Sequence, residues 1–585
     1  MWTSAAQRGT RRSLAGMKWT AASSLTLRVD MLLSFQQPVG APLTRSACDG
    51  EQATEDTSMK NLLATNLLAT LFLLSGAAKS IAEDKKDAKP IAISHVTIID
   101  VAGGSTQQDM TVVILGDRIT SVGKTENVTI PKNAEPVDGT GKFLIPGLWD
   151  MHVHMPVQSY LPLFLANGVT GIREMHAFFP AMIFKMRQDI RDGKLLGPRI
   201  VAAGAIIDGP KPFWPGSEVA GNEEEAGKAV QSLKKRGADF IKVYTKLPAS
   251  AYRAIADEAK KQGLPFVGHV PESVSAAEAS DLGQKSMEHL YGIVVSCSTE
   301  EDKLRLEELE GMAKLDNTAI RPLMVRTWVK AMDTYNEGKA QALFSKFAKN
   351  GTWQDPTLTV LRAMASLNDE KFTNDSRVKY MPAFLTSNWP KPGKPSEPPA
   401  PSTSPVPRNT PPTGRVQSTS PPPRNTPPTG RVQGAARSPG APGHAPGGRG
   451  QGEGENNLQR SYRNACRLVT AMHKAGVRFL AGTDVTNPYC FPGFSLHDEL
   501  SLLVSEAHFT PLEALQCATM NPAIFLGLEK DLGTVDKGKI ADLVLLDANP
   551  LDDIHNTQKI AAVFTAGRHL PKPDLQKMLK DAEGP

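Results

Sequence analysis

Eight short runs of β-like sequence, several of them separated by helical stretches, recur along the middle of the chain and constrain its fold more than any other feature. Such alternation is typical of a parallel α/β sheet, in which each helix returns the chain to the start of the next strand. Eight units predict a TIM (β/α)8 barrel, with its chemistry at the carboxyl ends of the strands. The runs are residues 143–155, 168–177, 198–207, 239–246, 265–271, 285–293, 351–360 and 477–485, and the clearest helical stretches are 249–262 and 458–475.

Two more β-rich segments lie at the outer ends of this region, at residues 90–142 and 533–568. Both alternate apolar and polar residues between Gly and Asp turn signals. We expect them to meet in one small β-sandwich. The predicted domains are therefore sandwich parts at 83–146 and 531–585, the second with a C-terminal tail, and barrel parts at 147–389 and 458–530.

A proline-rich segment at residues 390–457 interrupts the barrel region. Eighteen prolines fall between Pro390 and Arg449, where the sequence holds no Phe, Trp or Tyr, and a 16-residue unit starting at Thr403 repeats at Thr419. Such a segment cannot bury enough apolar surface to offset its ordering entropy. It is predicted to be a disordered insertion, with proline-rich ligand motifs as the less common alternative.

The amino-terminal region contains a leader-like pattern that begins at Met59. A lysine, an apolar run from Leu62 to Leu74 and small residues at Gly76 and Ala78 have the form of a secretory signal peptide at 59–82. We therefore expect residues 1–58 to be a disordered, non-native extension and the mature chain to be secreted or periplasmic, without a membrane anchor. A buried or anchoring helix is the alternative for this run.

Charge and cysteine content exclude other classes of protein. The net charge of +5 lies entirely within 390–457, where eight Lys and Arg face three Glu, so the remainder sums to zero. No basic face remains to favour nucleic acid. Four cysteines follow the leader without a CxxC spacing, and buried free thiols are the expectation. We expect a small-molecule or short-peptide substrate, and the sequence leaves homo-oligomers open.

Metal-binding residue types stand at the ends of the predicted strands. A lone pair of histidines such as His152 and His154 is more often structural than a metal site, but here the pattern continues along the chain. Imidazoles and carboxylates suit Zn²⁺ and similar ions, and the absence of cysteine favours a catalytic site. The full set is His152, His154, Lys242, His269, His289 and Asp484, at the ends of the first, fourth, fifth, sixth and eighth runs.

Lys242 is unexpected in such a set because an ammonium group has no lone pair to give to a metal. It fits if CO₂ adds to the amine, since the resulting carbamate bears oxygens that can bridge two cations. A lysine that extends to the strand end is the alternative. The neighbouring histidines favour the carbamate.

The motifs together resemble the amidohydrolase superfamily, and within it the secreted or periplasmic group that is similar to imidazolonepropionase and Xaa-Pro dipeptidases. The resemblance runs from about Ile91 to Arg568 outside the insertion and rests on PGLWDMHVHM, IKVYTK, GHVP, SMEHL, GTDV, SLHDELSLL and the segment from Pro511 to Asp547. It implies two divalent ions, expected to be zinc, bridged by carboxylated Lys242. His152, His154 and Asp484 would complete one site, and His269 with His289 the other.

The resemblance also implies a mechanism. A hydroxide that bridges the two metals would attack a carbonyl, and Asp484 would act as the catalytic general base and acid. The protein is therefore expected to be a metal-dependent amidohydrolase that cleaves C–N bonds in an amide or a dipeptide. The alternatives are a lactone, ester or organophosphate hydrolase on the same centre, or a catalytically inactive secreted binding protein.

Further polar and aromatic residues are weaker candidates for the site. Tyr244 shares a strand face with Lys242 and is a candidate for substrate binding, with a barrel-layer tyrosine equally favoured. His497 matches a family position near the pocket and is the second candidate for substrate binding, with a histidine at a helix start as the alternative. His176 departs from the family pattern, and we expect it to be a solvated strand-end histidine, with a residue that lines the substrate site as the alternative. Phe213 and Trp214 would wall the pocket or cover its rim.

Overall fold

The computed structural model describes residues 89–387, 389–390 and 456–583, which all belong to one unit, Glu83–Pro585. The predicted upstream extension at 1–58, the signal peptide at 59–82 and nearly all of the proline-rich insertion lie outside the described residues. Within the described part of the chain, no helix is long and apolar enough to cross a membrane.

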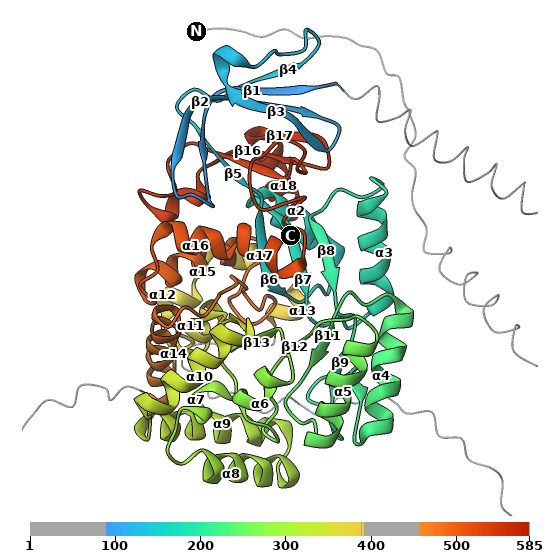
Figure 1. The fold of residues 1–585 in the computed structure, drawn as a ribbon, viewed down its shortest axis with the longest axis vertical. Coiled ribbons are helices and arrows are strands. Elements are labelled where there is room, and N and C mark those ends of the chain that lie inside the picture. The colour runs from blue at the N-terminus through green and yellow to red at the C-terminus, as the bar shows by residue number, and fades with distance from the viewer. Residues whose placement is uncertain (1–88, 388, 391–455, 584–585) are drawn as a thin grey trace, which may run out of the picture. The chain divides into compact units, whose positions relative to one another are not determined.

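Strands from both ends of the described chain join in one eight-stranded sheet (Figure 1). Its hydrogen-bonded path is β17-β16-β15-β5-β1-β2-β3, with β4 paired to β1. The two ends meet where Leu144 of β5 lies opposite Leu545 of β15. The strand pairing thus gives one sheet where two packed sheets of a sandwich were expected. The strands are β1 (Ile91–Ile99), β2 (Thr106–Leu115), β3 (Arg118–Lys124), β4 (Glu135–Asp138), β5 (Phe143–Pro146), β15 (Leu543–Leu546), β16 (Ile560–Thr565) and β17 (Arg568–Pro571).

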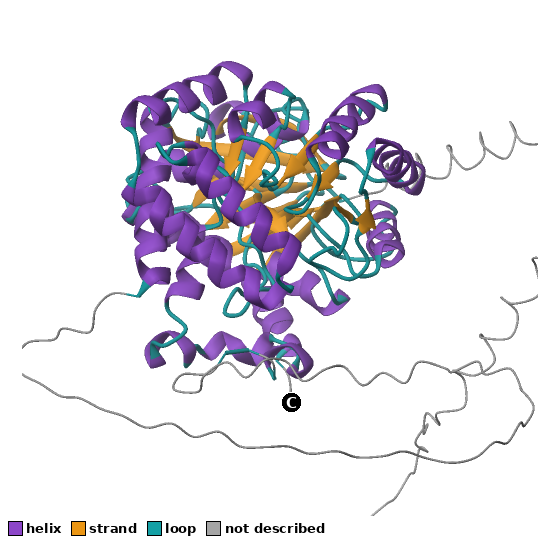
Figure 2. Cartoon of the chain, turned by 90° about the horizontal axis from the view of Figure 1, so that it is seen from below, coloured by secondary structure: helices purple, strands orange, loops and turns teal. Residues whose placement is uncertain are grey.

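The other strands pair in parallel, and most of them are fully buried, as expected where helices cover the sheet. They pair in the orders β6-β7-β8 and β10-β9-β11-β12-β13-β14. Figure 2 shows these strands at the centre, with helices around them. Their bounds are β6 (Leu148–Val153), β7 (Val169–Glu174), β8 (Arg199–Ala202), β9 (Ile206–Asp208), β10 (Glu218–Val219), β11 (Ile241–Val243), β12 (Phe266–Gly268), β13 (Ser286–Glu288) and β14 (Trp353–Asp355).

The eighth predicted run, at 477–485, connects the two groups of parallel strands without forming a regular strand. Isolated parallel bridges join Phe479 to Gln354 of β14 and Val485 to Val153 of β6. A backbone φ of 56° at Asp484 turns the chain out of the β region, so the ladder cannot continue. The segment nevertheless lies between β14 and β6, which makes the arrangement α/β and TIM-barrel-like.

The helices follow the predicted alternation, and their ends have clear local causes. The predicted helix at 458–475 begins at Asn457, because Asn456 and Gln459 form a reciprocal capping box. The described helices are α2 (Leu161–Ala166), α3 (Pro180–Arg191), α4 (Glu223–Arg236), α5 (Ala249–Lys261), α6 (Ala276–Asp281), α7 (Ile293–Ser296), α8 (Glu301–Lys314), α9 (Asn317–Asp333), α10 (Glu337–Asn350), α11 (Leu358–Ala365), α12 (Glu370–Thr373), α13 (Ala383–Thr386), α14 (Asn457–Lys474), α15 (Phe494–Ser505), α16 (Pro511–Cys517), α17 (Met520–Leu526) and α18 (Lys572–Ala582). The described 3-10 turns are η2 (Thr125–Asn127), η3 (Gln158–Tyr160), η4 (Ser376–Tyr380) and η5 (Ile554–Gln558).

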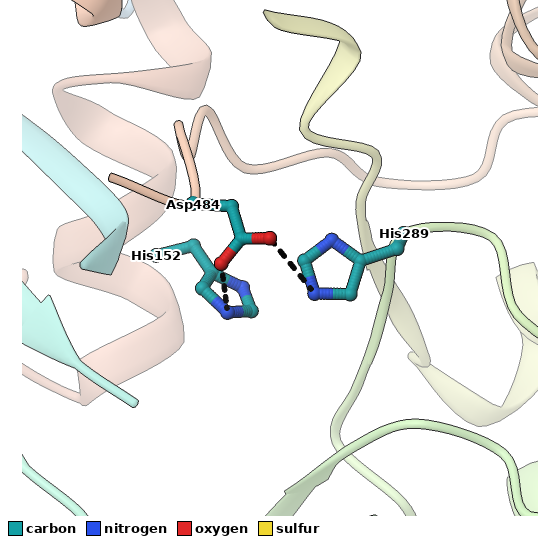
Figure 3. Close-up of side chains that lie close together, drawn as sticks. All are labelled: His152, His289 and Asp484. Atoms are coloured by element: carbon teal, nitrogen blue, oxygen red, sulfur yellow. Dashed lines mark ion pairs between the residues drawn. The ribbon is translucent and has the colours of Figure 1, made fainter. Parts of the chain in front are cut away.

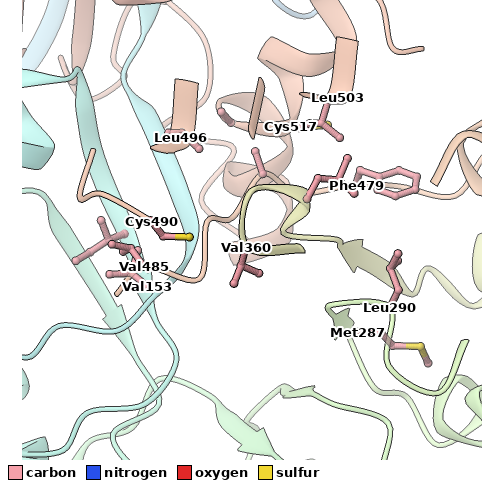
Figure 4. Close-up of a cluster of buried hydrophobic side chains, with 14 of the residues drawn as sticks. Val153, Met287, Leu290, Val360, Phe479, Val485, Cys490, Leu496, Leu503 and Cys517 are labelled. Atoms are coloured by element: carbon pink, nitrogen blue, oxygen red, sulfur yellow. The ribbon is translucent and has the colours of Figure 1, made fainter. Parts of the chain in front are cut away.

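A large apolar core lies between the parallel strands and these helices. Figure 4 shows part of it, where Val153, Phe479 and Leu496 are brought together from distant parts of the sequence. Four cysteines, Cys297, Cys466, Cys490 and Cys517, are buried free thiols, as the sequence predicted. The core fixes the strands, and the strand ends in turn fix the polar side chains described next.

Candidate metal centre

The six residues predicted as metal ligands lie at or just beyond the carboxyl ends of the parallel strands. Parallel strands present these ends on the same side of a sheet, so residues far apart in sequence converge. His152 lies in β6 and His154 just after it, Lys242 lies in β11, His269 follows β12, His289 follows β13, and Asp484 lies in the segment between β14 and β6.

Asp484 is the centre of this group. Its Oδ1 lies 3.0 Å from Nε2 of His154 and 3.5 Å from Nε2 of His152, and its Oδ2 lies 3.8 Å from Nε2 of His289. Figure 3 shows His152 and His289 on either side of the carboxylate. His152, His289 and Asp484 each offer one ligand atom within 4.8 Å of the other two, a spacing that a single metal ion can bridge.

His269 and Lys242 extend the group. The ring of His269 lies 5.1 Å from that of His289, between centroids. Lys242 is buried, and its Nζ has no hydrogen-bond partner among the described residues. Burial lowers the pKa of His152 and His269, and the positive charge of Lys242 lowers it further. Burial also lowers the pKa of Lys242, whereas the negative charge of Asp484 acts to raise it. Lys242 is therefore close enough to share the electrostatic environment of the site.

Each of the four histidines is anchored through Nδ1. His152 Nδ1 lies 3.1 Å from Glu288 Oε2, and His154 Nδ1 lies 3.1 Å from the carbonyl oxygen of His176. The other two are held by hydroxyl groups, His269 by Thr245 at 2.8 Å and His289 by Thr357 at 2.7 Å. Such partners fix ring orientation and leave Nε2 available, which is the usual arrangement of metal-binding histidines.

The inward-facing atoms fit a divalent metal. Nε2 of His152 and of His269 are buried without a hydrogen-bond partner in the described structure, which is costly unless a ligand binds them. Burial lowers the pKa of both well below the ordinary value, and that of His289 to about 4, so these imidazoles are neutral and keep a lone pair. Burial alone would raise the pKa of Asp484, but His289 and His154 lower it, so the carboxylate is ionised.

The backbone is held in unusual conformations at the same place. His289 and Asp484 have φ of 59° and 56°, in the left-handed region that non-glycine residues seldom adopt. Beside them, a Cβ on Gly482 would lie 2.6 Å from the Asp355 carboxylate and 2.7 Å from Cβ of His152. Only glycine permits this approach, which presses the Asp484 segment against β6. Backbone strain of this kind concentrates at functional sites.

Two tyrosines stack on the histidines. Tyr244 lies 3.9 Å from the ring of His269, and Tyr291, which the sequence did not predict, lies 4.6 Å from it. Trp214 Nε1 donates a hydrogen bond of 2.8 Å to the Tyr244 hydroxyl, so the tyrosine proton is free to point elsewhere. Phe213 packs edge-on to Tyr244. Tyr244, Phe213 and Trp214 thus form an aromatic wall beside His269.

The carboxyl end of β7 contributes two buried groups. His176 is only 2% exposed, so the prediction of a solvated histidine was wrong: the end of β7 is covered. Burial lowers its pKa to about 3, and its Nε2 has no partner in the described structure. Glu174 is also buried with neither carboxylate oxygen hydrogen-bonded, and burial raises its pKa well above the ordinary value. The positive charge of Lys242 acts to lower the pKa of Glu174, so the two side chains lie near each other.

His497, predicted to bind substrate, has both ring nitrogens in hydrogen bonds within the protein. Its Nδ1 lies 2.9 Å from the Thr557 hydroxyl, and its Nε2 lies 3.0 Å from the carbonyl oxygen of Asn167. Both ring nitrogens are thus used to tie α15 to η5 and to the end of α2. No ring nitrogen of His497 is left without a protein partner, and its substrate contact stays a prediction.

A buried ion cluster supports the site from beneath and was also not predicted. Arg173 donates hydrogen bonds of 2.9 Å to Glu288, Asp355 and Ser286. Burial, and then the adjacent Glu288, raises the pKa of Asp355 well above its ordinary value. His152, Glu288 and Asp355 also have the spacing of a metal site, but Arg173 already binds both carboxylates.

Comparisons of sequence relate part of the chain to known proteins. Residues 456–570 match the model of the amidohydrolase family. An ochratoxinase of Aspergillus niger is 34% identical over 116 residues, 19% of this chain and 23% of the relative. An imidazolonepropionase of Shouchella clausii is 37% identical over 119 residues, 18% of this chain and 26% of the relative. The match therefore spans about a quarter of the length of these relatives.

Comparisons of structure cover much more of the chain. Bottromycin amidohydrolase is similar with a TM-score of 0.61 and 20% identity, over 84% of this chain and 89% of the other. A Xaa-Pro dipeptidase with bound methionine gives a TM-score of 0.52 at 19% identity, over 83% and 100%. The crystal structure of Aspergillus niger ochratoxinase gives 0.51 at 19%, over 83% and 96%. At these identities the similarity shows the fold, which is α/β with a TIM-barrel-like domain.

Proposed function

We propose, from the match of residues 456–570 to the amidohydrolase family model, that the chain is a metal-dependent hydrolase of C–N bonds, acting on an amide or a dipeptide. In this proposal the parallel strands and segment 479–485 form one closed barrel, with β8 and β9 as two halves of its third strand. The site lies at the mouth of that barrel, where such enzymes bind substrate.

The observation that carries the proposal is the common orientation of the histidines. Nδ1 of each of the four is held by a protein group, whereas Nε2 of His152, His154 and His289 faces Asp484 and that of His269 lacks a partner. A structural histidine such as His497 uses both nitrogens. The nitrogen and oxygen donors, without cysteine, suit zinc or a similar divalent ion.

The six predicted residues would hold two such ions, with Lys242 between them as a carbamate. An ammonium group buried without a hydrogen-bond partner is unfavourable, and the carbamate would replace its positive charge with a negative one that neighbouring cations neutralise. When bound, divalent ions lower the pKa of water and polarise a carbonyl oxygen.

The remaining groups position and move protons. Asp484, ionised and 3.0 Å from His154, is placed to accept a proton during attack and to return it to the leaving nitrogen. Burial raises the pKa of Tyr244, so its hydroxyl stays protonated. Because its oxygen already accepts from Trp214, the Tyr244 proton can be donated to a substrate carbonyl.

We also propose that the mature protein is secreted or periplasmic. The support is the leader-like segment at 59–82, which lies outside the described residues. Amino-terminal sequencing of protein recovered from the medium or periplasm should find a start after Ala78 or Ala82.

Metal removal tests the proposed function directly. The protein is treated with a chelator, and hydrolysis of a panel of amides and dipeptides is measured before and after, and again after addition of Zn²⁺, Mn²⁺ or Co²⁺. Loss and return of amide hydrolysis are expected. If only lactones, esters or organophosphates are hydrolysed, the enzyme acts on another class of electrophile. If the metal-loaded protein hydrolyses none of the compounds, the proposal that it is an enzyme is wrong.

A further inference from the structure

Asp208, at the end of β9, is a fully buried carboxylate that neither binds metal nor moves a proton in the proposed reaction. Its Oδ1 accepts hydrogen bonds from the backbone N–H of Gly209 at 2.9 Å and of Lys246 at 2.8 Å. Its Oδ2 accepts from the backbone N–H of Phe213 at 3.0 Å. Burial raises the pKa of Asp208, and these three donors act to lower it. One side chain thus binds both the loop after β9 and the loop after β11.

These two loops touch each other beside the carboxylate. They are residues 209–217, between β9 and β10, and residues 244–246, which follow β11. A Cβ on Gly209 would lie 1.9 Å from the carbonyl oxygen of Lys246, so a larger residue would push the loops apart. Lys246 also reaches back, since its Nζ donates a hydrogen bond of 3.0 Å to the carbonyl oxygen of Lys211. The base of loop 209–217 is therefore fixed against the loop after β11.

The start of α9 holds the same loop from another side. Asn317 Nδ2 donates to the carbonyl oxygens of Pro212 and Phe213, each at 3.3 Å. Asn317 Oδ1 accepts from Lys246 Nζ at 2.5 Å. Asn317 and Lys246 are only partly buried, so water can replace some of their contacts. The hydrogen bonds of the buried Asp208 carboxylate are harder to replace.

Loop 209–217 reaches the candidate metal centre through Trp214. Trp214 Nε1 donates a hydrogen bond of 2.8 Å to the Tyr244 hydroxyl, and the Tyr244 ring stacks on His269 with 3.9 Å between centroids. Stacking fixes the plane of the tyrosine, and the indole N–H occupies one acceptor position of the hydroxyl oxygen. The Tyr244 proton must then point away from the indole. The place of Trp214 therefore sets the direction in which Tyr244 can donate.

We propose that Asp208 is a positioning residue: it holds loop 209–217 against the loop after β11, keeps Trp214 on the Tyr244 hydroxyl and so directs the Tyr244 proton toward the substrate carbonyl. The catalytic half of this inference rests on the proposed hydrolase function, in which Tyr244 is the donor. The structural half, that Asp208 maintains the contact between Trp214 and Tyr244, does not. A carboxylate that only stabilised the fold would affect activity independently of Trp214.

A double-mutant cycle in the full-length, metal-loaded protein separates these two roles. Asp208→Asn replaces one acceptor oxygen with an NH2 group, and Trp214→Phe keeps an aromatic ring without the indole N–H. Each should lower kcat for an amide about tenfold, with KM changed by less than about threefold, because a hydrogen bond that directs the proton is lost. The double variant should be at most about twofold slower than Trp214→Phe, since both substitutions act on one contact. If Asp208→Asn does not fold, Asp208→Glu replaces it, because it keeps the charge and displaces both oxygens.

Asp239→Asn is the matched control. Asp239 also accepts from a backbone N–H, that of Ala202 at 2.9 Å, and binds Arg187, but it lies before β11, at the amino end of that strand. Its substitution should lower stability and leave kcat per folded molecule unchanged. Losses of kcat that multiply when Asp208→Asn and Trp214→Phe are combined would overturn the proposal, and so would an equal loss in Asp239→Asn.

Exchange of the Trp214 indole N–H tests the structural half without any substrate. Tryptophan is labelled with ¹⁵N, and the Trp214 signal is assigned by its absence in Trp214→Phe. Hydrogen–deuterium exchange of this N–H should be at least about tenfold faster in Asp208→Asn than in the wild type, and unchanged in Asp239→Asn. If the wild type hydrolyses no amide, the proposed function fails, and this exchange rate alone decides on Asp208. Equal rates in the wild type and Asp208→Asn would show that Asp208 does not hold Trp214 in place.

Discussion

Two buried polar clusters lie on either side of His152, and they differ in how their atoms are satisfied. In the lower cluster, Arg173 binds Glu288 and Asp355 directly, and of these two carboxylates only Asp355 Oδ1 is buried without a hydrogen-bond partner among the described residues. In the upper cluster, Nε2 of His152 and Nζ of Lys242 have no partner among the described residues. The two clusters are equally buried but have opposite roles. The lower cluster stabilises the fold, and the upper cluster keeps atoms available for ligands.

The strongest way to break this comparison is to remove the carboxylate of the upper cluster. Asp484→Asn keeps the size of the side chain but cannot accept a proton. We expect kcat to fall by roughly 10²–10⁴-fold, the usual contribution of a positioned general base, while metal content falls only modestly. Steady-state kinetics and metal analysis on the same preparation measure both. Full activity in the variant would show that the proton is handled elsewhere.

Removal of the lower cluster's only cation should instead damage stability. Arg173→Met leaves Glu288 and Asp355 buried without their partner, and we expect a loss of about 3–5 kcal/mol in the free energy of unfolding. Urea unfolding followed by circular dichroism measures it. Lys185→Met is the control, because Lys185 is an exposed lysine and its salt bridge should contribute less than about 1 kcal/mol. Similar losses in both variants would contradict the structural role of Arg173.

Glu288 contacts both clusters, so its substitution shows which of them it serves. It accepts from Arg173 and also holds His152 Nδ1 at 3.1 Å. Glu288→Gln should weaken metal affinity by about 10–100-fold, as is usual when the partner of a ligating histidine is changed. Competition with a chelator of known affinity gives the value. Unchanged affinity would mean that Glu288 serves the lower cluster alone.

His497 gives the smallest effect and the cleanest separation of structure from catalysis. His497→Leu loses the hydrogen bonds to Thr557 and to the carbonyl of Asn167, and should cost about 1–3 kcal/mol of stability. Metal content and kcat per folded molecule should stay at the wild-type level at 20 °C. A large fall in kcat without a fall in stability would restore His497 to the site.

The residues that sequence reasoning located best are those at strand ends. An apolar run predicts a buried strand, and a polar residue that interrupts the run marks where the strand leaves the core. This pattern located His152, Lys242 and Asp484. The parallel α/β pattern then implied convergence at one end. The alternation of apolar and polar residues at 90–142 and 533–568 predicted that the two ends of this region meet in β-structure. It did not predict that their strands pair in a single sheet.

What the sequence could not give depends on partners distant along the chain. The role of His497 is set by Asn167, 330 residues away, and that of Arg173 by Asp355, 182 residues away. The burial of His176 follows from loops that cover β7, which no local pattern encodes. Tyr291 did carry a signal, since it stands two residues after His289, but an aromatic residue in an apolar run is usually core.

Metal content per chain, measured in parallel for wild type and Lys242→Ala, tests the central claim most directly. The carbamate oxygens proposed to bridge the metals would disappear with Lys242, so the variant should lose most of the metal that wild type binds stoichiometrically, together with hydrolysis. Short carboxylic acids should restore part of the activity by replacing the carbamate. Equal metal content and turnover in the two proteins, or an active wild type without stoichiometric metal, would contradict a lysine-bridged metal centre.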